Sequence, residues 1–299
     1  MSNASLVQQL VYDIAQLNPR QKHFLEKSIQ EISSLEMSEL EAYIGEQLDK
    51  GLGLSDLAEA YNRIVVDTLA EQIYFKKEGR YRFSKFVQVA EGVYHDPRYM
   101  KEYMIGLALT QYLWSNHRIL YQFFCESIRE SKGRSYLEIG TGHGLHFGFA
   151  VQNGDFDSYL AVDLSETSIQ LTEKRIEKIT HEKDVVIKLA DFLSFDSQTK
   201  FDFIAMGEVL EHVEEPQIFM AKLKELLAPK GRVFISTCCN APAIDHIYLF
   251  NNVDEVVDLC RNAGFQISSE CVVPHPGLTL NEAEEKKYPV NLALVLNHA

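Results

Sequence analysis

The stretch Tyr136-Leu-Glu-Ile-Gly-Thr-Gly-His-Gly144 decides the fold of this chain. Residues 135–139 form an aromatic and β-branched run, which predicts a buried strand, and residues 145–151 predict the start of a helix. Gly140 and Gly142 lie between them, where glycine permits a tight turn and a close approach to a ligand that a Cβ would block. The order of strand, glycine turn and helix therefore predicts a ligand-binding turn.

The spacing of the glycines separates this turn from two common nucleotide cradles. Gly144 follows Gly142 by two positions, whereas the dinucleotide fingerprint G-x-G-x-x-G needs three, and no Gly-Lys-Ser/Thr follows as a P-loop would require. The pattern E-x-G-x-G-x-G, formed by Glu138, Gly140, Gly142 and Gly144, resembles the first motif of class I S-adenosylmethionine (SAM) methyltransferases. That resemblance implies a SAM site, with Glu138 near the amino group of the methionine moiety.

The chain after residue 131 alternates strand-like and helix-like segments, the pattern of a parallel sheet with crossover helices. Strands are expected at 135–140, 158–163, 185–190, 201–206, 231–237, 266–273 and 289–297. Helices are expected at 144–152, 166–180, 216–228 and 253–263. The predicted fold class is therefore α/β, a Rossmann-like class I methyltransferase sheet that is mostly parallel with its last strand antiparallel.

The front of the chain has helical periodicity instead. Residues 1–130 are expected to form an all-helical lid and dimerisation domain, and residues 131–299 the SAM-binding methyltransferase domain. Within the front domain we expect a helix at 21–35, N-caps at Ser38 and Ser55, and one long aromatic helix at 97–129.

Acidic residues follow the second and third predicted strands. Asp163 ends the second strand, where a carboxylate can accept both ribose hydroxyls of a nucleoside cofactor, and Leu164 beside it can pack on the adenine. Asp191 and Phe192 end the third strand, where the resemblance implies an acid for the adenine amino group and an aromatic neighbour. Each acid alone could be a helix cap or a loop residue. Their order at the carboxyl ends of strands, where open α/β sheets bind ligands, favours SAM binding.

A second polar set follows the fifth and sixth predicted strands. Asp245, His246 and His275 would give one carboxylate and two imidazoles, which leaves positions open for a chelating substrate. They form the predicted metal site, and His246 and His275 are the predicted catalytic residues in that role. The alternative is that Asp245 caps a short helix and His275 lies in an exposed loop. Glu208 and His212, four residues apart with Glu211 between them, are a weaker metal candidate.

The helical front domain, the stretch Cys-Cys-Asn-Ala-Pro-Ala-Ile-Asp245-His246 and the late Pro-His275-Pro look similar to α-keto acid C-methyltransferases of amino-acid and peptide natural product biosynthesis. This resemblance implies a divalent metal (Zn, Fe or similar) that chelates a 2-oxo acid and stabilises the enolate that attacks the SAM methyl at C3. The proton-abstracting base is not identified, because His143 and His146 are better explained as structural histidines. Arg98, His117 and Arg118 of the last front helix could bind a carboxylate or could be ordinary surface charges.

The composition limits which kinds of binding partner and which cellular location we expect. The chain has 299 residues and a net charge of −14 without a basic block, which disfavours nucleic acid. It has no apolar run long enough for a membrane span and no signal-peptide pattern, and its five cysteines form no CxxC pair, so we expect a cytoplasmic protein. The expected partners are a small-molecule substrate and a second copy of the chain, as a homodimer.

Two other function classes remain open at this point. One is a metal-independent O- or N-methyltransferase of a small metabolite, with His212 or His246 as base. The other is a SAM-binding regulator without activity, which an acid at every cofactor position disfavours.

Overall fold

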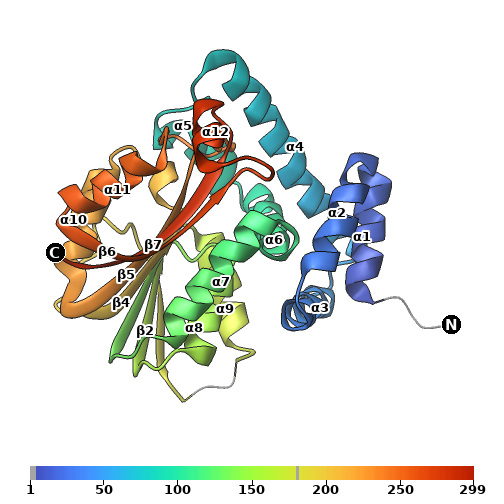
Figure 1. Ribbon diagram of the computed structural model, residues 1–299. Coiled ribbons are helices and arrows are strands. Elements are labelled where there is room, and N and C mark those ends of the chain that lie inside the picture. The colour runs from blue at the N-terminus through green and yellow to red at the C-terminus, as the bar shows by residue number, and fades with distance from the viewer. Residues whose placement is uncertain (1–4, 180–181) are drawn as a thin grey trace.

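The computed structural model describes residues 5–179 and 182–299. Its centre is a seven-stranded sheet with the strand order β3-β2-β1-β4-β5-β7-β6 (Figure 1). The strands are β1 (Ser135–Ile139), β2 (Ser158–Asp163), β3 (Asp184–Leu189), β4 (Phe201–Gly207), β5 (Leu227–Cys239), β6 (Phe265–Pro274) and β7 (Val290–His298). Strands β1 to β5 pair in parallel, and β7 is antiparallel to both β5 and β6. The predicted Rossmann-like sheet with an antiparallel last strand is therefore confirmed.

Helices cover both faces of the sheet. Figure 1 shows α10 and α11 on one side and α7, α8 and α9 on the other. Four of these follow strands: α8 (Leu145–Asn153), α9 (Glu166–Ile176), α10 (Pro216–Leu226) and α11 (Val253–Asn262). Because side chains alternate along a strand, neighbouring residues of β1 enter different cores, Tyr136 the one under α8 and Leu137 the one under α10 and α11. Helix α9 ends at Ile176, before the predicted end at position 180, which lies outside the described residues.

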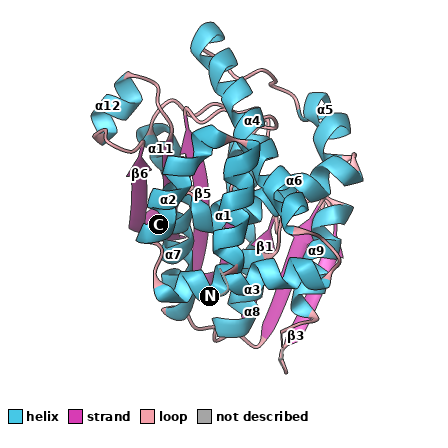
Figure 2. Ribbon diagram, turned by 90° about the vertical axis from the view of Figure 1, so that its right-hand side faces the viewer, coloured by secondary structure: helices cyan, strands magenta, loops and turns pink. Residues whose placement is uncertain are grey.

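The front of the chain is helical, as predicted, but its boundaries differ (Figure 2). Its helices are α1 (Leu6–Leu17), α2 (Lys22–Glu31), α3 (Ser34–Asp49), α4 (Leu54–Glu78), α5 (Phe86–Val89), α6 (Pro97–Leu113) and α7 (Ser115–Arg129); a short helix α12 (Leu280–Glu285) lies before β7. The N-cap of α3 is Ser33, whose side chain accepts from the backbone N–H of Glu36, so the prediction of Ser38 was wrong. Helix α4 begins one residue before Ser55, with Gly53 at the cap.

The largest difference concerns the long aromatic helix predicted at 97–129. The chain leaves helical geometry at Trp114, where φ is −104° and ψ is 123°, and this splits the segment into α6 and α7. Helix α7 then packs on α8 and on β7, while α6 packs on α4. A hydrophobic core shared by the front helices and the sheet includes Leu109 and Phe124 beside Tyr136. The domain boundary at residue 130 stays a prediction.

Helix α6 crosses α4 at a glycine. A Cβ on Gly106 would collide with the carbonyl oxygen of Ala60 and lie 2.6 Å from Ile64 Cγ1. Residues of both α4 and α6 line the cavity described below, so this crossing fixes the position of that part of the cavity wall.

We therefore expect Gly106→Ala to destabilise the protein by about 2 kcal/mol or more, since backbone atoms cannot yield as a flexible side chain does. Gly45→Ala is the matched control, because Gly45 is also inside a helix but its Cβ would meet only Leu6 Cδ1 at 4.0 Å. It should stabilise the helix by about 0.5 to 1 kcal/mol. Urea unfolding of both variants measures the difference, and equal stabilities would contradict the close approach.

Candidate active site

The glycine turn connects β1 to α8 and has the backbone geometry that its sequence predicts. Gly140, Gly142 and Gly144 have φ angles of +73°, +52° and +77°, in the region that favours glycine. Asp163 at the end of β2 holds the turn, because one carboxylate oxygen accepts from the Gly142 N–H at 3.1 Å and the other from the Ser165 N–H at 2.8 Å. Burial raises the pKa of Asp163 above its usual value.

Two members of the glycine motif face away from the cavity. Gly144 starts α8, where a Cβ would lie 3.0 Å from the Cα of Thr172, so it serves close helix packing. Glu138 is buried and accepts a hydrogen bond from the Tyr136 hydroxyl at 2.5 Å, and burial raises its pKa to about 8. Neither residue is part of the cavity wall among the described residues, although both were predicted to bind the cofactor.

The other predicted cofactor residues lie together. Gly140, Gly142, Asp163 and Leu164 form one part of the cavity wall, and Asp191 with Phe192 forms the adjoining part. Leu164 is 46% exposed, which leaves its side chain free to cover a bound base. Asp191 is exposed at the surface of the wall.

A single cavity of about 1180 Å³ joins this region to the predicted metal residues. Its wall includes Asp245, His246 and His275 as well as the glycine turn. The volume exceeds the upper end of the usual ligand-pocket range, about 1,000 Å³, which leaves room for a cofactor and a small second molecule. Among the described residues of the wall there is no lysine or arginine.

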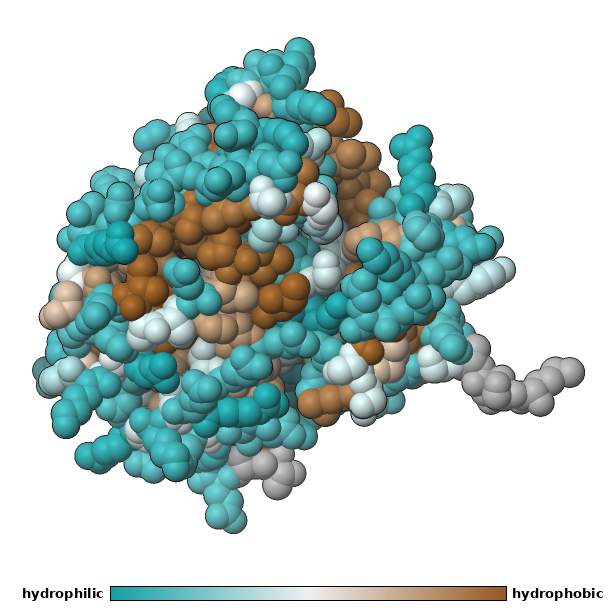
Figure 3. Space-filling view, in the orientation of Figure 1, coloured by the Kyte–Doolittle hydropathy of each residue, from teal (hydrophilic) through white to brown (hydrophobic). Residues whose placement is uncertain are grey.

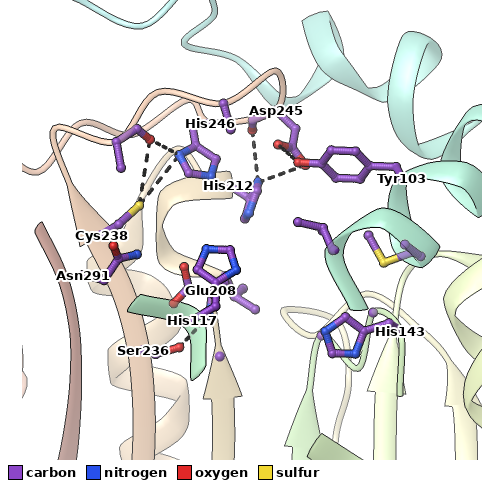
Figure 4. Close-up of a pocket in the computed structure, with 18 of the residues that line it drawn as sticks. Tyr103, His117, His143, Glu208, His212, Ser236, Cys238, Asp245, His246 and Asn291 are labelled. Atoms are coloured by element: carbon purple, nitrogen blue, oxygen red, sulfur yellow. Dashed lines mark hydrogen bonds and ion pairs between the residues drawn. The ribbon is translucent and has the colours of Figure 1, made fainter. Parts of the chain in front are cut away.

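Asp245 is held by two tyrosines of the helical front region. The Tyr103 hydroxyl of α6 donates to Oδ1 at 2.9 Å (Figure 4). The Tyr94 hydroxyl donates to Oδ2 at 3.1 Å. Tyr94 ends a π-helical turn at residues 90–94, a rare geometry that is frequent at functional sites. Burial and the Asp245 charge raise the pKa of both tyrosines well above the usual value, so both hydroxyls remain donors.

Two histidines lie beside this carboxylate. His212 Nδ1 is 3.1 Å from the Asp245 carbonyl oxygen and 3.4 Å from its Oδ2, so the Nδ1–H donates to Asp245. His246 Nδ1 is 2.6 Å from the Ala241 carbonyl oxygen and also donates. Burial lowers the pKa of His246 to about 3, which keeps its ring neutral. Potential ligand atoms of His212, Asp245 and His246 lie within 4.8 Å of one another.

His275 is in the same cavity but outside that cluster. It follows β6, its Nδ1 is 3.1 Å from the Pro276 carbonyl oxygen, and its ring packs on Tyr288 at 4.8 Å between centroids. The structure therefore brings together two of the three predicted metal ligands and places the third elsewhere in the wall of the same cavity.

The two glutamates of the weaker metal candidate, Glu208 and Glu211, face different surroundings. Glu208 has a left-handed backbone (φ +51°) and faces the cavity, and a 3-10 helix (Leu210–His212) follows it instead of the start of an α-helix. Glu211 points into the protein, where Thr237 donates to it at 2.7 Å. Burial and the Glu208 charge raise the pKa of Glu211 well above its usual value, and the Glu208 and Glu211 side chains hydrogen-bond to each other.

Sequence reasoning missed Tyr94 and Tyr103 as partners of Asp245. Tyr103 lies inside the aromatic helix predicted at 97–129 and Tyr94 just before it, and neither position points to Asp245. Of the three candidates for carboxylate binding, Arg98, His117 and Arg118, only His117 lines the cavity. Arg118 is buried and forms ion pairs with Glu31 and Glu36.

Comparison with known proteins identifies the class. The model of a methyltransferase domain family matches residues 117–270, just over half of the chain. The chain therefore belongs to this family, and with its fold and glycine motif it is a class I SAM-dependent methyltransferase.

The relatives found among characterised proteins carry this class in their names. The ubiquinone biosynthesis O-methyltransferase of Coxiella burnetii (strain RSA 493 / Nine Mile phase I) is 31% identical over 106 residues, which are 36% of this chain and 44% of that enzyme. The (S)-coclaurine N-methyltransferase of Thalictrum flavum subsp. glaucum is 24% identical over 146 residues, 49% of this chain and 40% of that enzyme. The chain thus spans less than half of the length of these curated relatives.

A solved structure shows the same fold. The protein bound to the Trm112 methyltransferase activator of Haloferax volcanii has a TM-score of 0.50 and 14% identity, covering 69% of this chain and 98% of that chain. No helix among the described residues is both long and apolar enough to cross a membrane.

Proposed function

We propose that this enzyme transfers the SAM methyl group to C3 of a small 2-oxo acid. The observation that carries this proposal is a cavity that joins the SAM site to the buried Asp245 carboxylate and the histidines beside it, with no lysine or arginine in its described wall. A carboxylate acceptor would find no cationic side chain there. A bound divalent metal would supply the missing positive charge and make the neighbouring C3 proton more acidic.

The residues present fit such a metal. We propose Asp245, His246 and His275 as its ligands. His246 and His275 each direct Nδ1 at a backbone carbonyl, which leaves the Nε2 lone pair for a metal, the arrangement common in metal-binding histidines. The two tyrosine hydroxyls on Asp245 orient its carboxylate in the same way. His212 is the competing third ligand, because it lies nearer to the pair.

Metal content and product identity test this proposal together. We expect purified enzyme to contain a stoichiometric divalent metal and to convert one of a panel of 2-oxo acids to its C3-methylated product, as seen by mass spectrometry and NMR. His275→Ala should lose metal and turnover while its SAM affinity stays unchanged. His212→Ala is the matched variant, and it should keep the metal if His275 is the third ligand. Full activity after removal of metal by a chelator would contradict the proposal.

One observation favours a second candidate, a metal-independent O- or N-methyltransferase. The His212–Asp245 contact resembles the pairs in which a carboxylate orients a histidine base. The names of the two curated relatives agree with transfer to oxygen or nitrogen. Chelator-resistant methylation of a phenol or an amine would establish this candidate.

The proposed enzyme acts in the cytoplasm as a homodimer. Val66, Leu69 and Ile73 are 51%, 46% and 62% exposed at helical spacing on α4, and Figure 3 shows apolar surface where Figure 1 draws this helix. An exposed apolar stripe of this kind supports self-association.

A further inference from the structure

We propose that His117 is the general base that takes the proton from the acceptor carbon, an inference that rests on the function proposed above. The helix break at Trp114 places His117 in the first turn of α7, so its ring comes from the front region and not from the loops that carry Asp245 and His246. Figure 4 shows this ring directed into the cavity on the side of His212 and Glu208. The base would thus reach the acceptor from a different wall than the metal.

A hydrogen-bond chain sets the tautomer of His117. The Thr110 hydroxyl donates its only proton to the Leu107 carbonyl oxygen at 2.8 Å, and its oxygen lies 3.0 Å from His117 Nδ1. Since the hydroxyl has no second proton, Nδ1 must carry one and donate it. The Nε2 lone pair of a neutral ring is then free, and no hydrogen-bond partner of Nε2 is found within residues 5–179 and 182–299.

Hydrogen bonds also fix the backbone around His117. Gln111 Nε2 donates to the His117 carbonyl oxygen at 2.9 Å, and Asn116 Nδ2 donates to Asn291 Oδ1 at 2.9 Å, which ties the start of α7 to β7. The Trp114 ring packs on the imidazole at 5.0 Å between centroids. A side chain fixed in this way meets the positioning that proton transfer needs.

The other histidines of the cavity are worse placed to accept a proton. His143 Nδ1 accepts from the Leu145 N–H at 3.1 Å, so its Nε2 carries the proton. His146 packs edge-on against aromatic rings. His212 and His246 belong to the cluster with Asp245, where a bound ion would compete with a proton for their nitrogens.

Burial lowers the pKa of His117 to about 4, so the ring is neutral and able to accept at neutral pH. Besides His143, His146, His212 and Glu208, the described wall of its cavity carries the following titratable groups: His95, His246, His275, Asp163, Asp191, Asp245, Glu214, Glu215, Tyr94, Tyr103, Tyr121 and Cys238. Among them Glu208 is the rival base, because its carboxylate faces the same cavity.

Proton removal from C3 precedes methyl transfer. The C3–H bond breaks, its proton goes to His117 Nε2, its electron pair forms the C2–C3 π bond, and the C2=O π pair moves onto oxygen to give the enolate. The enolate carbon then attacks the SAM methyl, so the C3–CH3 bond forms while the S–CH3 electron pair stays on sulfur and leaves S-adenosylhomocysteine. The imidazolium returns its proton to water.

Deuterium exchange separates the base from the methyl donor. Wild-type enzyme with S-adenosylhomocysteine and its 2-oxo acid in D2O should exchange the C3 protons without methylation, followed by NMR. His117→Ala and His117→Gln should lose exchange and turnover by about 10²- to 10⁴-fold, the usual range for a general base, with SAM affinity and metal content unchanged. Added imidazole should restore part of the exchange in His117→Ala, which a purely structural role would not allow. Thr110→Val, which removes the Nδ1 partner, should lose less than His117→Ala.

Two results would overturn the inference in different ways. If wild-type enzyme exchanges C3 protons and His117→Ala exchanges them within about threefold of that rate, the base is another group, and loss in Glu208→Gln would point to the rival; the proposed function would stand. If wild-type enzyme neither exchanges nor methylates any 2-oxo acid, the proposed function fails and this inference fails with it.

Discussion

Replacing Asp163 with alanine should weaken SAM binding about a hundredfold, or about 2.8 kcal/mol. The carboxylate lies at the end of β2 in the cavity wall, where it can accept both ribose hydroxyls, and each hydrogen bond to a charged group contributes about 1.5 to 3 kcal/mol. It also accepts from the N–H groups of Gly142 and Ser165, so its loss loosens the turn that must face the cofactor. Isothermal titration calorimetry with SAM measures the effect without knowledge of the acceptor.

Two variants separate these contributions. Asp163→Asn keeps an acceptor for the turn but not the charge, so its SAM affinity should lie between wild type and Asp163→Ala. Asp191→Ala removes an exposed carboxylate proposed to contact only the adenine amino group, and we expect a loss of about tenfold or less, one hydrogen bond. A SAM affinity of Asp163→Ala within threefold of wild type would show that the cofactor binds elsewhere.

The cofactor half of the site could be predicted because each residue lies next to a strand in sequence. Asp163 ends β2 and Asp191 lies two residues after β3, and parallel strands bring their carboxyl ends to one edge of the sheet. Glu138 and Gly144 show where this reasoning stops. Both belong to the motif, yet Glu138 is buried and accepts from the Tyr136 hydroxyl, and Gly144 packs against Thr172. The contact of Gly144 depends on how α8 and α9 are arranged, which the local sequence does not show.

The acceptor half depends on contacts between distant parts of the chain. Tyr103 is 142 residues from Asp245, and Tyr94 is 151 residues away, so no local pattern connects them. The break at Trp114 was missed for a related reason. Helical periodicity continues through it, and neither glycine nor proline marks it, because the packing of α7 on the sheet and of α6 on α4 sets the turn.

Asp245→Asn should reduce turnover by about 10³-fold or more while SAM affinity stays within twofold of wild type, a loss of the size seen when a catalytic carboxylate becomes an amide. Asparagine keeps the shape of the side chain but removes its charge, and both candidate functions need that charge, either as a metal ligand or to orient His212. The buried hydroxyls of Tyr94 and Tyr103 donate to a carboxylate but cannot both donate to an amide. Steady-state kinetics with SAM titration measures both quantities.

Conservative changes of the tyrosines set the scale for this loss. Tyr103→Phe removes one hydrogen bond to a carboxylate that remains charged, so we expect turnover to fall by roughly tenfold. The metal content of wild type and of Asp245→Asn then distinguishes the two candidate functions. If the variant loses metal together with activity, the 2-oxo acid chemistry is supported. If it loses activity and the wild-type enzyme holds no metal, His212 is supported as the base. The Asp245→Asn substitution removes the carboxylate that Tyr94, Tyr103 and His212 contact. Turnover of this variant at the wild-type rate would therefore contradict both candidate functions.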